Sequence, residues 1–293
     1  MTTATTAAIA GAPPAAVGDA APAAPVALRG VGRAFAAPDG GTRDVLRGVD
    51  LDIAAGEIVA ILGPSGCGKS TLLRIVAGLD HPTSGEADID GEPVQSYDVR
   101  CAVGFQEPRL LPWRSLERNV ALGLPRGTAR RAGRAHVARL LELVGLAEFA
   151  GHRPHEVSGG MAQRASLARA LARNPEVLLL DEPFGALDAL TRLRMQDLLL
   201  DVHAAEPTTV LLVTHDVDEA LQLADRIVLL GSDGAAPGAD VRQTVVVPGH
   251  RPRDRGSAEL AELRGRLLDG LGIDRHGAAR GIQATTTIPH FPY

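Results

Sequence analysis

Apolar residues recur along the chain with two periods, and each period predicts a different kind of element. VALRGVGRAF and VLRGVDLDI alternate roughly every second residue, which is typical of half-buried strands. The segments EIVAIL, CAVGF, VLLL, TVLLV and RIVLL are short, continuously apolar runs, as in strands buried on both faces. TLLRIVAGL, AHVARLLELVGL and LTRLRMQDLLLDVHA predict helices, and apolar residues spaced three and four apart mark such a helix face.

The order of these elements predicts an α/β protein with a helical insertion. Strand and helix alternate twice, which implies a parallel sheet covered by helices. Helical patterns dominate between Ser115 and Leu146, where the alternation is interrupted. GEADIDGEPV predicts two short strands joined at Asp90-Gly91, a tight-turn pair. The resulting division is an Ala/Pro-rich disordered leader (1–25), a main domain (26–250) with a helical insertion (about 107–172), a C-terminal helical extension (251–275) and a tail (276–293).

Composition and charge narrow the classes of function. The net charge of −5 argues against a nucleic-acid partner, because phosphates select basic surfaces. Cys67 and Cys101 have no CxxC spacing and indicate reduced thiols. The leader lacks a basic segment of the kind that precedes a secretion signal. No stretch approaches the ~20 apolar residues of a membrane-spanning helix, so work at a membrane would need an embedded partner.

One glycine-rich segment carries a phosphate-binding signal. GPSGCGKS fits the P-loop pattern, and it lies between a predicted strand and a predicted helix, the context that supports the assignment. Backbone N–H groups and a helix N-terminus would surround phosphate, Lys69 would reach the β- and γ-phosphates, and the Ser70 hydroxyl would bind Mg²⁺. The expected nucleotide-binding residues here are Gly63, Pro64, Ser65, Gly66, Cys67, Gly68, Lys69, Ser70 and Thr71.

A second segment, which is acidic, supplies residues that would act on the bound phosphates. VLLLDE places Asp181 and Glu182 at the end of a buried strand, where doubly wound sheets bind ligands. Asp181 would hold Mg²⁺ through water, and Glu182 would orient the attacking water or accept its proton. The alternative, an acidic pair that caps the next helix, loses weight beside the P-loop.

VSGGMAQR, a helix upstream of VLLLDE, resembles the signature motif of ABC ATPases. The resemblance covers roughly 26–268 and implies a P-loop NTPase fold with a RecA-like core, an antiparallel β subdomain and an inserted helical subdomain. It also implies ATP and Mg²⁺ as cofactors. The residues carried over are Ser158, Gly159 and Gly160 (signature), Gln106 (Q-loop), Asp188 (D-loop), His215 (switch histidine) and Phe35 (adenine stacking).

The resemblance implies a role for each of these residues. The signature would face the γ-phosphate held by a second subunit, so that the chain works as a homodimer. Gln106 would contact Mg²⁺ or the attacking water, His215 would sense the γ-phosphate, and Asp188 would link the two sites. With Glu182 and Lys69, the residues Gln106 and His215 form the expected catalytic set. Phe35 stands where Tyr is more frequent, and its alternative is a core aromatic.

Three further segments are similar to the nitrate/sulfonate/taurine importer group, and most to its aliphatic sulfonate ATPases: RLLPWRSLERNVALGL, DALTRLRMQDLLLDVH and PGHRPRDRGSAELAELRGRLL. The resemblance implies two integral-membrane permease subunits, a sulfonate-binding protein that acts through them, and a peripheral position on the cytoplasmic face of the membrane. Trp113 would contact the permease, or alternatively pack the Q-loop against the helical subdomain.

Several alternatives remain at this stage. The cargo could be taurine, nitrate or a thiamine precursor, because the ATPase does not touch it. A non-transport ABC switch usually has two cassettes or a long coiled coil, and neither is present. A P-loop kinase or GTPase would lack the signature. An arginine cluster predicts a solvated helix face or, less favoured, a docking surface: Arg126, Arg130, Arg131, Arg134 and Arg139.

Overall fold

The computed structural model describes residues 22–37, 40–232, 234 and 236–272. Most of the expected leader and the whole expected tail lie outside these residues. The leader boundary at residue 25 needs a correction, because Ala24 is only 4 % exposed and its carbonyl accepts a hydrogen bond of 2.6 Å from the Thr209 hydroxyl. Ordered contacts therefore begin before Val26.

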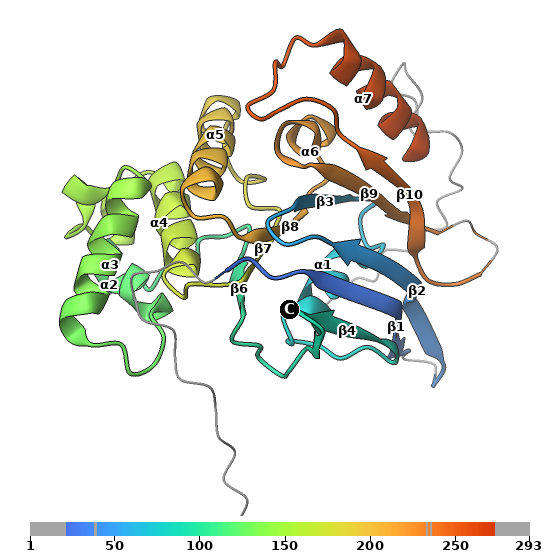
Figure 1. The fold of residues 1–293 in the computed structure, drawn as a ribbon, viewed down its shortest axis with the longest axis horizontal. Helices are drawn as coiled ribbons and strands as arrows, with labels where there is room; N and C mark the ends of the chain where they lie inside the picture. Colours follow the sequence, from blue (N-terminus) through green and yellow to red (C-terminus); the bar gives the residue numbers. More distant parts are fainter. Residues whose placement is uncertain (1–21, 38–39, 233, 235, 273–293) are drawn as a thin grey trace, which may run out of the picture.

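A four-stranded antiparallel sheet forms one side of the molecule (Figure 1). Its order is β2-β1-β4-β5. The strands are β1 (Val26–Ala36), β2 (Thr42–Ile53), β4 (Ser84–Ile89) and β5 (Glu92–Pro93). The predicted turn between β4 and β5 is present, with Asp90 at φ 52° and Gly91 at φ 73°. Both angles are left-handed, which a turn of this kind requires.

The central sheet has six strands in the order β10-β9-β3-β8-β7-β6. These are β3 (Ile58–Leu62), β6 (Cys101–Gly104), β7 (Val177–Asp181), β8 (Thr209–Val213), β9 (Arg226–Gly231) and β10 (Asp240–Val246). Neighbouring strands from β6 to β9 run parallel, and β10 joins the edge antiparallel to β9. The carboxyl ends of β3, β7 and β8 therefore share one edge, where their apolar runs give way to polar residues.

Four helices pack against the sheets. They are α1 (Lys69–Val76), α5 (Ala189–Ala205), α6 (Val217–Leu223) and α7 (Ala258–Gly270). Helix α1 contacts strands of both sheets, and its apolar side chains belong to the core that the two sheets share. Helix α7 packs on α6, within the region expected as a C-terminal helical extension.

A group of helices lies to one side of the central sheet (Figure 1). It comprises α2 (Leu116–Val120), α3 (Arg130–Leu143), α4 (Gly159–Leu171) and three 3-10 turns (Ala121–Gly123, Ala147–Phe149 and Pro154–Glu156). The predicted spacing buries Val137, Leu140 and Leu141 on one face of α3. The five clustered arginines are all exposed, as a solvated face requires. This group is inserted between β6 and β7.

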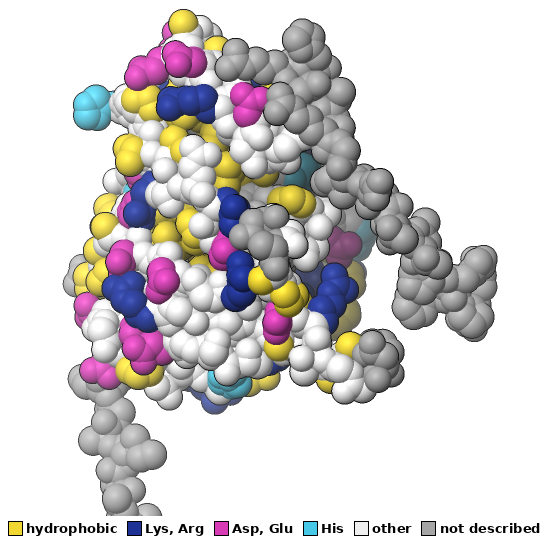
Figure 2. Space-filling model, turned by 90° about the vertical axis from the view of Figure 1, so that its right-hand side faces the viewer, with side chains coloured by type: hydrophobic (Ala, Val, Ile, Leu, Met, Phe, Trp, Pro, Cys, Tyr) yellow, Lys and Arg dark blue, Asp and Glu magenta, His cyan; other side chains and the backbone are white. Residues whose placement is uncertain are grey.

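Charged side chains of both signs are interspersed on the face shown in Figure 2. Among the described residues, no helix is both long and apolar enough to cross a membrane.

Candidate functional site

The glycine-rich loop follows β3 and leads directly into α1. Gly68, at φ 100°, precedes the first helical residue, and Gly66 has φ 78°, so both have backbone angles that favour glycine. Gly63 is required for another reason, since a Cβ there would lie 2.3 Å from the carbonyl oxygen of Leu230 on β9. The loop is thus held against the sheet while its far side faces a cavity.

Lys69 is the only lysine of the chain; every other permanently cationic side chain is arginine. It is 7 % exposed, and its Nζ donates hydrogen bonds to the carbonyl oxygens of Gly63 (2.8 Å) and Pro64 (2.9 Å). The ammonium group is therefore folded back across the loop. A compact cation on a flexible stem suits phosphate in this position.

Cys67 lies inside the same loop. Burial raises the pKa of its thiol, which keeps it neutral. Together with Cys101 it is free, as the sequence predicted.

Ser70 and Asp181 meet across the edge of the sheet. The Ser70 hydroxyl donates to Oδ1 of Asp181 at 3.0 Å, although the two residues are 111 positions apart. The first comes from α1 and the second from the last position of β7. Hydroxyl and carboxylate oxygens in contact form part of a donor set that suits Mg²⁺.

Glu182 follows Asp181 with a left-handed backbone, at φ 47°. Its N–H donates to the carbonyl oxygen of Val213 at 2.9 Å, which fixes this turn to β8. Its Oε2 lies 3.3 Å from Nδ1 of His215. A non-glycine residue with positive φ is strained, and such strain occurs often at functional sites.

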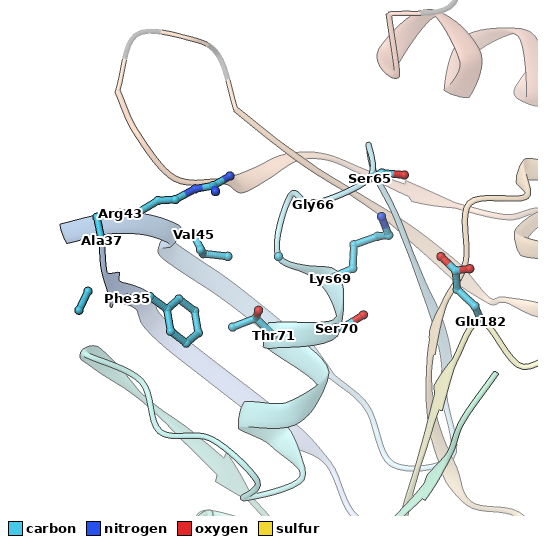
Figure 3. A pocket seen from close by; sticks show the side chains of 12 residues that line it. Phe35, Ala37, Arg43, Val45, Ser65, Gly66, Lys69, Ser70, Thr71 and Glu182 are labelled. Atoms are coloured by element: carbon cyan, nitrogen blue, oxygen red, sulfur yellow. The ribbon is translucent and has the colours of Figure 1, made fainter. Parts of the chain in front are cut away.

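The glycine-rich loop, Ser70 and Glu182 border a cavity of about 660 Å³ (Figure 3). Phe35 lies at one end, Glu182 at the other, and Lys69 and Ser70 between them. The complete lining is Phe35, Ala36, Ala37, Arg43, Val45, Ser65, Gly66, Gly68, Lys69, Ser70, Thr71 and Glu182.

Phe35 is not a core residue. Its side chain is 39 % exposed, and the guanidinium carbon of Arg33 lies 4.3 Å from the ring centroid. The interpretation of Phe35 as a buried aromatic is therefore wrong. Its position at the rim leaves the ring available for stacking.

Ser158, Gly159 and Gly160 do not line this cavity within the part of the chain that the structure describes. The Ser158 hydroxyl accepts from the Met161 N–H at 3.3 Å and so caps the exposed N-terminus of α4. A Cβ on Gly160 would lie 2.5 Å from Cγ2 of Thr191 on α5. The P-loop and the signature segment of one chain thus belong to different surfaces.

Asp188 caps the N-terminus of α5. Its Oδ1 accepts from the Thr191 N–H at 3.0 Å and caps α5. Hydrogen bonds from the Thr191 side chain and backbone lower the pKa of Asp188, so its carboxylate is ionised at neutral pH.

Sequence reasoning missed Gln163, which joins two of the predicted segments. Its Nε2 donates to the carbonyl oxygens of Phe105 (3.1 Å) and Pro183 (2.8 Å), the residues that precede Gln106 and follow Glu182. Gln163 is only 6 % exposed. A polar residue among the apolar positions of the signature helix was the signal available in the sequence. Gln106 itself is exposed and lies close to Gly185.

Trp113 is 67 % exposed, so the interpretation that it packs the Q-loop against the helices is wrong. Tyr97, Val99 and Leu79 are also large exposed apolar residues. A groove of about 310 Å³ between the sheet and the helical group is lined by Ala77, Leu79, Tyr97, Asp98, Cys101, Ala102, Val103, Gly123, Arg169, Ala170 and Arg173.

Comparison with known proteins matches residues 46–185 to the ABC transporter family. The "Aliphatic sulfonates import ATP-binding protein SsuB 1" of Pseudomonas syringae pv. tomato is 52 % identical over 250 residues, 85 % of this chain and 84 % of that protein. The protein of the same name from Mesorhizobium japonicum is 49 % identical over 245 residues, with 84 % and 88 % covered.

Solved structures are similar too. A dimeric ATP-binding cassette in a post-hydrolysis state, bound to ADP and Pi, is 35 % identical with a TM-score of 0.64. The similarity covers 77 % of this chain and all of that one. The expected fold class, a P-loop ABC ATPase, is thereby confirmed.

Proposed function

Because the chain belongs to the ABC transporter family of ATP-binding cassettes, we propose that it is the ATP-hydrolysing subunit of an importer for aliphatic sulfonates. The ATPase part is carried by one observation: a single cavity joins the lysine-bearing glycine loop to the strained Glu182. The cargo is supported by the names of relatives about half identical to this chain.

ATP would lie in the cavity with its adenine at Phe35 and its phosphates at the glycine-rich loop. Phe35 at the rim would stack on the adenine, and the loop N–H groups with the α1 N-terminus would surround the phosphates. Lys69 now satisfies its ammonium with two loop carbonyls, and phosphate oxygens would replace them as stronger, charged acceptors.

Magnesium fits the donor set at the sheet edge. Ser70 and Asp181 already bring two oxygens together, and Gln106 would add an amide oxygen. When bound, the ion neutralises charge on the phosphates. Asp181 and Ser70 would hold the ion at the carboxyl edge of the sheet, next to Glu182.

Hydrolysis needs a base at the γ-phosphate end of the cavity. Glu182 lies there and would accept a proton from the attacking water. His215, within 3.3 Å of its carboxylate, would orient Glu182 and donate to the γ-phosphate.

A second copy of the chain completes each site. The exposed N-terminus of α4 presents Ser158, Gly159 and Gly160 away from the cavity of its own subunit. An anion favours such a helix end. We infer that these residues bind the γ-phosphate held by the partner, and that Asp188 lies between the two sites.

The groove beside the helical group is the proposed contact with the permease. The groove lies between the sheet and the helical group that follows the Q-loop residue Gln106. Exposed Leu79 and Tyr97 line it. Trp113, on the segment after Gln106, would extend this apolar contact. Two permease subunits would hold the dimer at the cytoplasmic face of the membrane, and a binding protein would act through them.

The test is reconstitution of the chain with its permease and binding protein in vesicles. ATPase activity should rise with an alkanesulfonate-loaded binding protein. Taurine, nitrate and thiamine precursors form the comparison panel, and stimulation by one of these alone would reassign the cargo. Trp113→Ala should abolish stimulation yet leave the ATPase activity of the free subunit unchanged. ATPase activity that does not change when the permease is present would contradict the importer proposal.

A further inference from the structure

The D-loop and the segment that carries His215 are neighbours within one subunit. Helix α5 begins directly after Asp188, and α6 begins two residues after His215. One side chain, Arg192 in the first turn of α5, touches both segments. Neither the P-loop nor the signature involves this residue.

The Arg192 guanidinium makes two hydrogen bonds. Its Nη1 donates to Oδ2 of Asp216 at 3.2 Å, and its Nη2 donates to the carbonyl oxygen of Leu187 at 3.3 Å. Leu187 lies in the D-loop and Asp216 directly follows His215. Because the guanidinium is planar and rigid, a displacement of one segment would strain the hydrogen bond to the other.

Asp216 is a firm anchor for this contact. Its Oδ1 accepts from the N–H groups of Asp218 (2.9 Å) and Glu219 (3.1 Å), the first turn of α6. Its Oδ2 is left for Arg192. The carboxylate therefore caps a helix with one oxygen and holds the arginine with the other.

The neighbouring carboxyl group of Glu219 leaves Arg192 to pair with Asp216. Glu219 is 3 % exposed, and burial raises its pKa to about 8, with the Asp216 charge as a second cause. Glu219 is therefore neutral at pH 7 and does not compete with Asp216 for the cation. Within the described part of the chain, Oε1 of Glu219 and Nε of Arg192 are buried without hydrogen-bond partners. Buried polar atoms without partners are uncommon in folded proteins, and each calls for an explanation.

We propose that Arg192 is a positioning residue that couples the His215 segment to the D-loop of the same subunit. Loss of the γ-phosphate at His215 would shift Asp216, then Arg192, then Leu187 and Asp188. Since Asp188 would lie between the two sites of the dimer, the event at one ATP reaches the other. This inference rests on the proposed ATPase function.

The test uses Arg192→Ala and Asp216→Asn. Asparagine is as good a helix cap as aspartate, so Asp216→Asn removes the charge for Arg192 and retains α6. Each variant should lower kcat about tenfold, leave the KM for ATP within about twofold, and abolish cooperativity in ATP concentration. The kcat of the double variant should be no lower than that of the less active single variant, because both substitutions break the same contact.

Arg264→Ala is the matched control. Arg264 also pairs with the first turn of α6, through Asp218 at 3.0 Å, but both side chains are more than half exposed. This variant should keep the kcat and the cooperativity of the wild type. A purely structural role for Arg192 predicts a lower melting temperature with the cooperativity intact, and that result would overturn the inference.

Additive losses in the double variant, or unchanged kcat and cooperativity in Asp216→Asn, would also overturn it. The measurement on Asp216→Asn tests the inference even where Arg192→Ala does not fold. Failure of the underlying function is distinguishable, because the wild-type chain itself would then release no phosphate from ATP, whatever the Arg192 result.

Discussion

Nδ1 of His215 lies 3.3 Å from Oε2 of Glu182, and the two residues come from the ends of neighbouring parallel strands, β8 and β7. The imidazole is more than half exposed, while the carboxylate is mostly covered. The pair therefore joins a protected base to a side chain that can respond to a bound nucleotide.

Glu182→Gln should bind ATP, form a stable dimer and hydrolyse about a hundredfold more slowly or worse, because the amide cannot accept a proton from water. Size-exclusion chromatography in ATP and phosphate release measure the two effects. Glu92→Gln, at an exposed position on β5, is the control and should behave as wild type. Normal turnover by Glu182→Gln would remove Glu182 from its role.

The single lysine permits an unambiguous labelling experiment. An acyl-phosphate derivative of ATP should acylate Lys69, since the ammonium lies in the loop that would hold the phosphates. Excess ATP should suppress the label, and Lys69→Ala should weaken nucleotide binding by roughly tenfold or more through loss of a charge-assisted contact. Mass spectrometry identifies the site. Labelling of the N-terminal amine serves as the internal reference, and ATP-insensitive labelling of Lys69 would contradict the assignment.

Gly160→Ala should destabilise the fold by about 1–3 kcal/mol, because its Cβ would overlap Cγ2 of Thr191. Thr191→Ser removes that methyl group and retains the hydroxyl, so the double variant should recover most of the loss. Thermal unfolding of the wild type, the two single variants and the double variant gives a double-mutant cycle. For Gly159→Ala, no described atom lies within 4 Å of the added Cβ, so this control should keep its stability. Equal melting temperatures for the two glycine variants would disprove the close approach.

Glu219 makes stability depend on pH. Its folded pKa of about 8 exceeds the ordinary 4.5, so its contribution is fully present below about pH 4.5 and is lost as pH rises through about 8. Glu219→Gln should flatten this slope and be the more stable protein at pH 8, by on the order of 1–3 kcal/mol. Urea unfolding at several pH values measures it. Glu262→Gln, exposed on α7, should leave the slope unchanged; an unchanged slope in Glu219→Gln would refute the protonated state.

Local patterns in the sequence predicted the phosphate loop, the acidic strand end and the helical insertion of this protein. The run from Gly63 to Thr71 predicted a phosphate loop because its glycines, its lysine and the flanking strand and helix are contiguous in the chain. Asp181 and Glu182 were predicted at a strand end for the same reason, since a continuously apolar run that stops at acidic residues marks the end of a buried strand. The helical insertion likewise shows in the spacing of its apolar residues.

Contacts between distant segments needed the tertiary structure. Ser70 meets Asp181, Gln163 joins the residues beside Gln106 and Glu182, and Arg192 joins Leu187 to Asp216. No local period encodes such pairs, because they depend on which strands become neighbours and how helices pack on them. The exposure of Phe35 and Trp113 was decided in the same way: an aromatic residue carries no local mark of whether another element covers it.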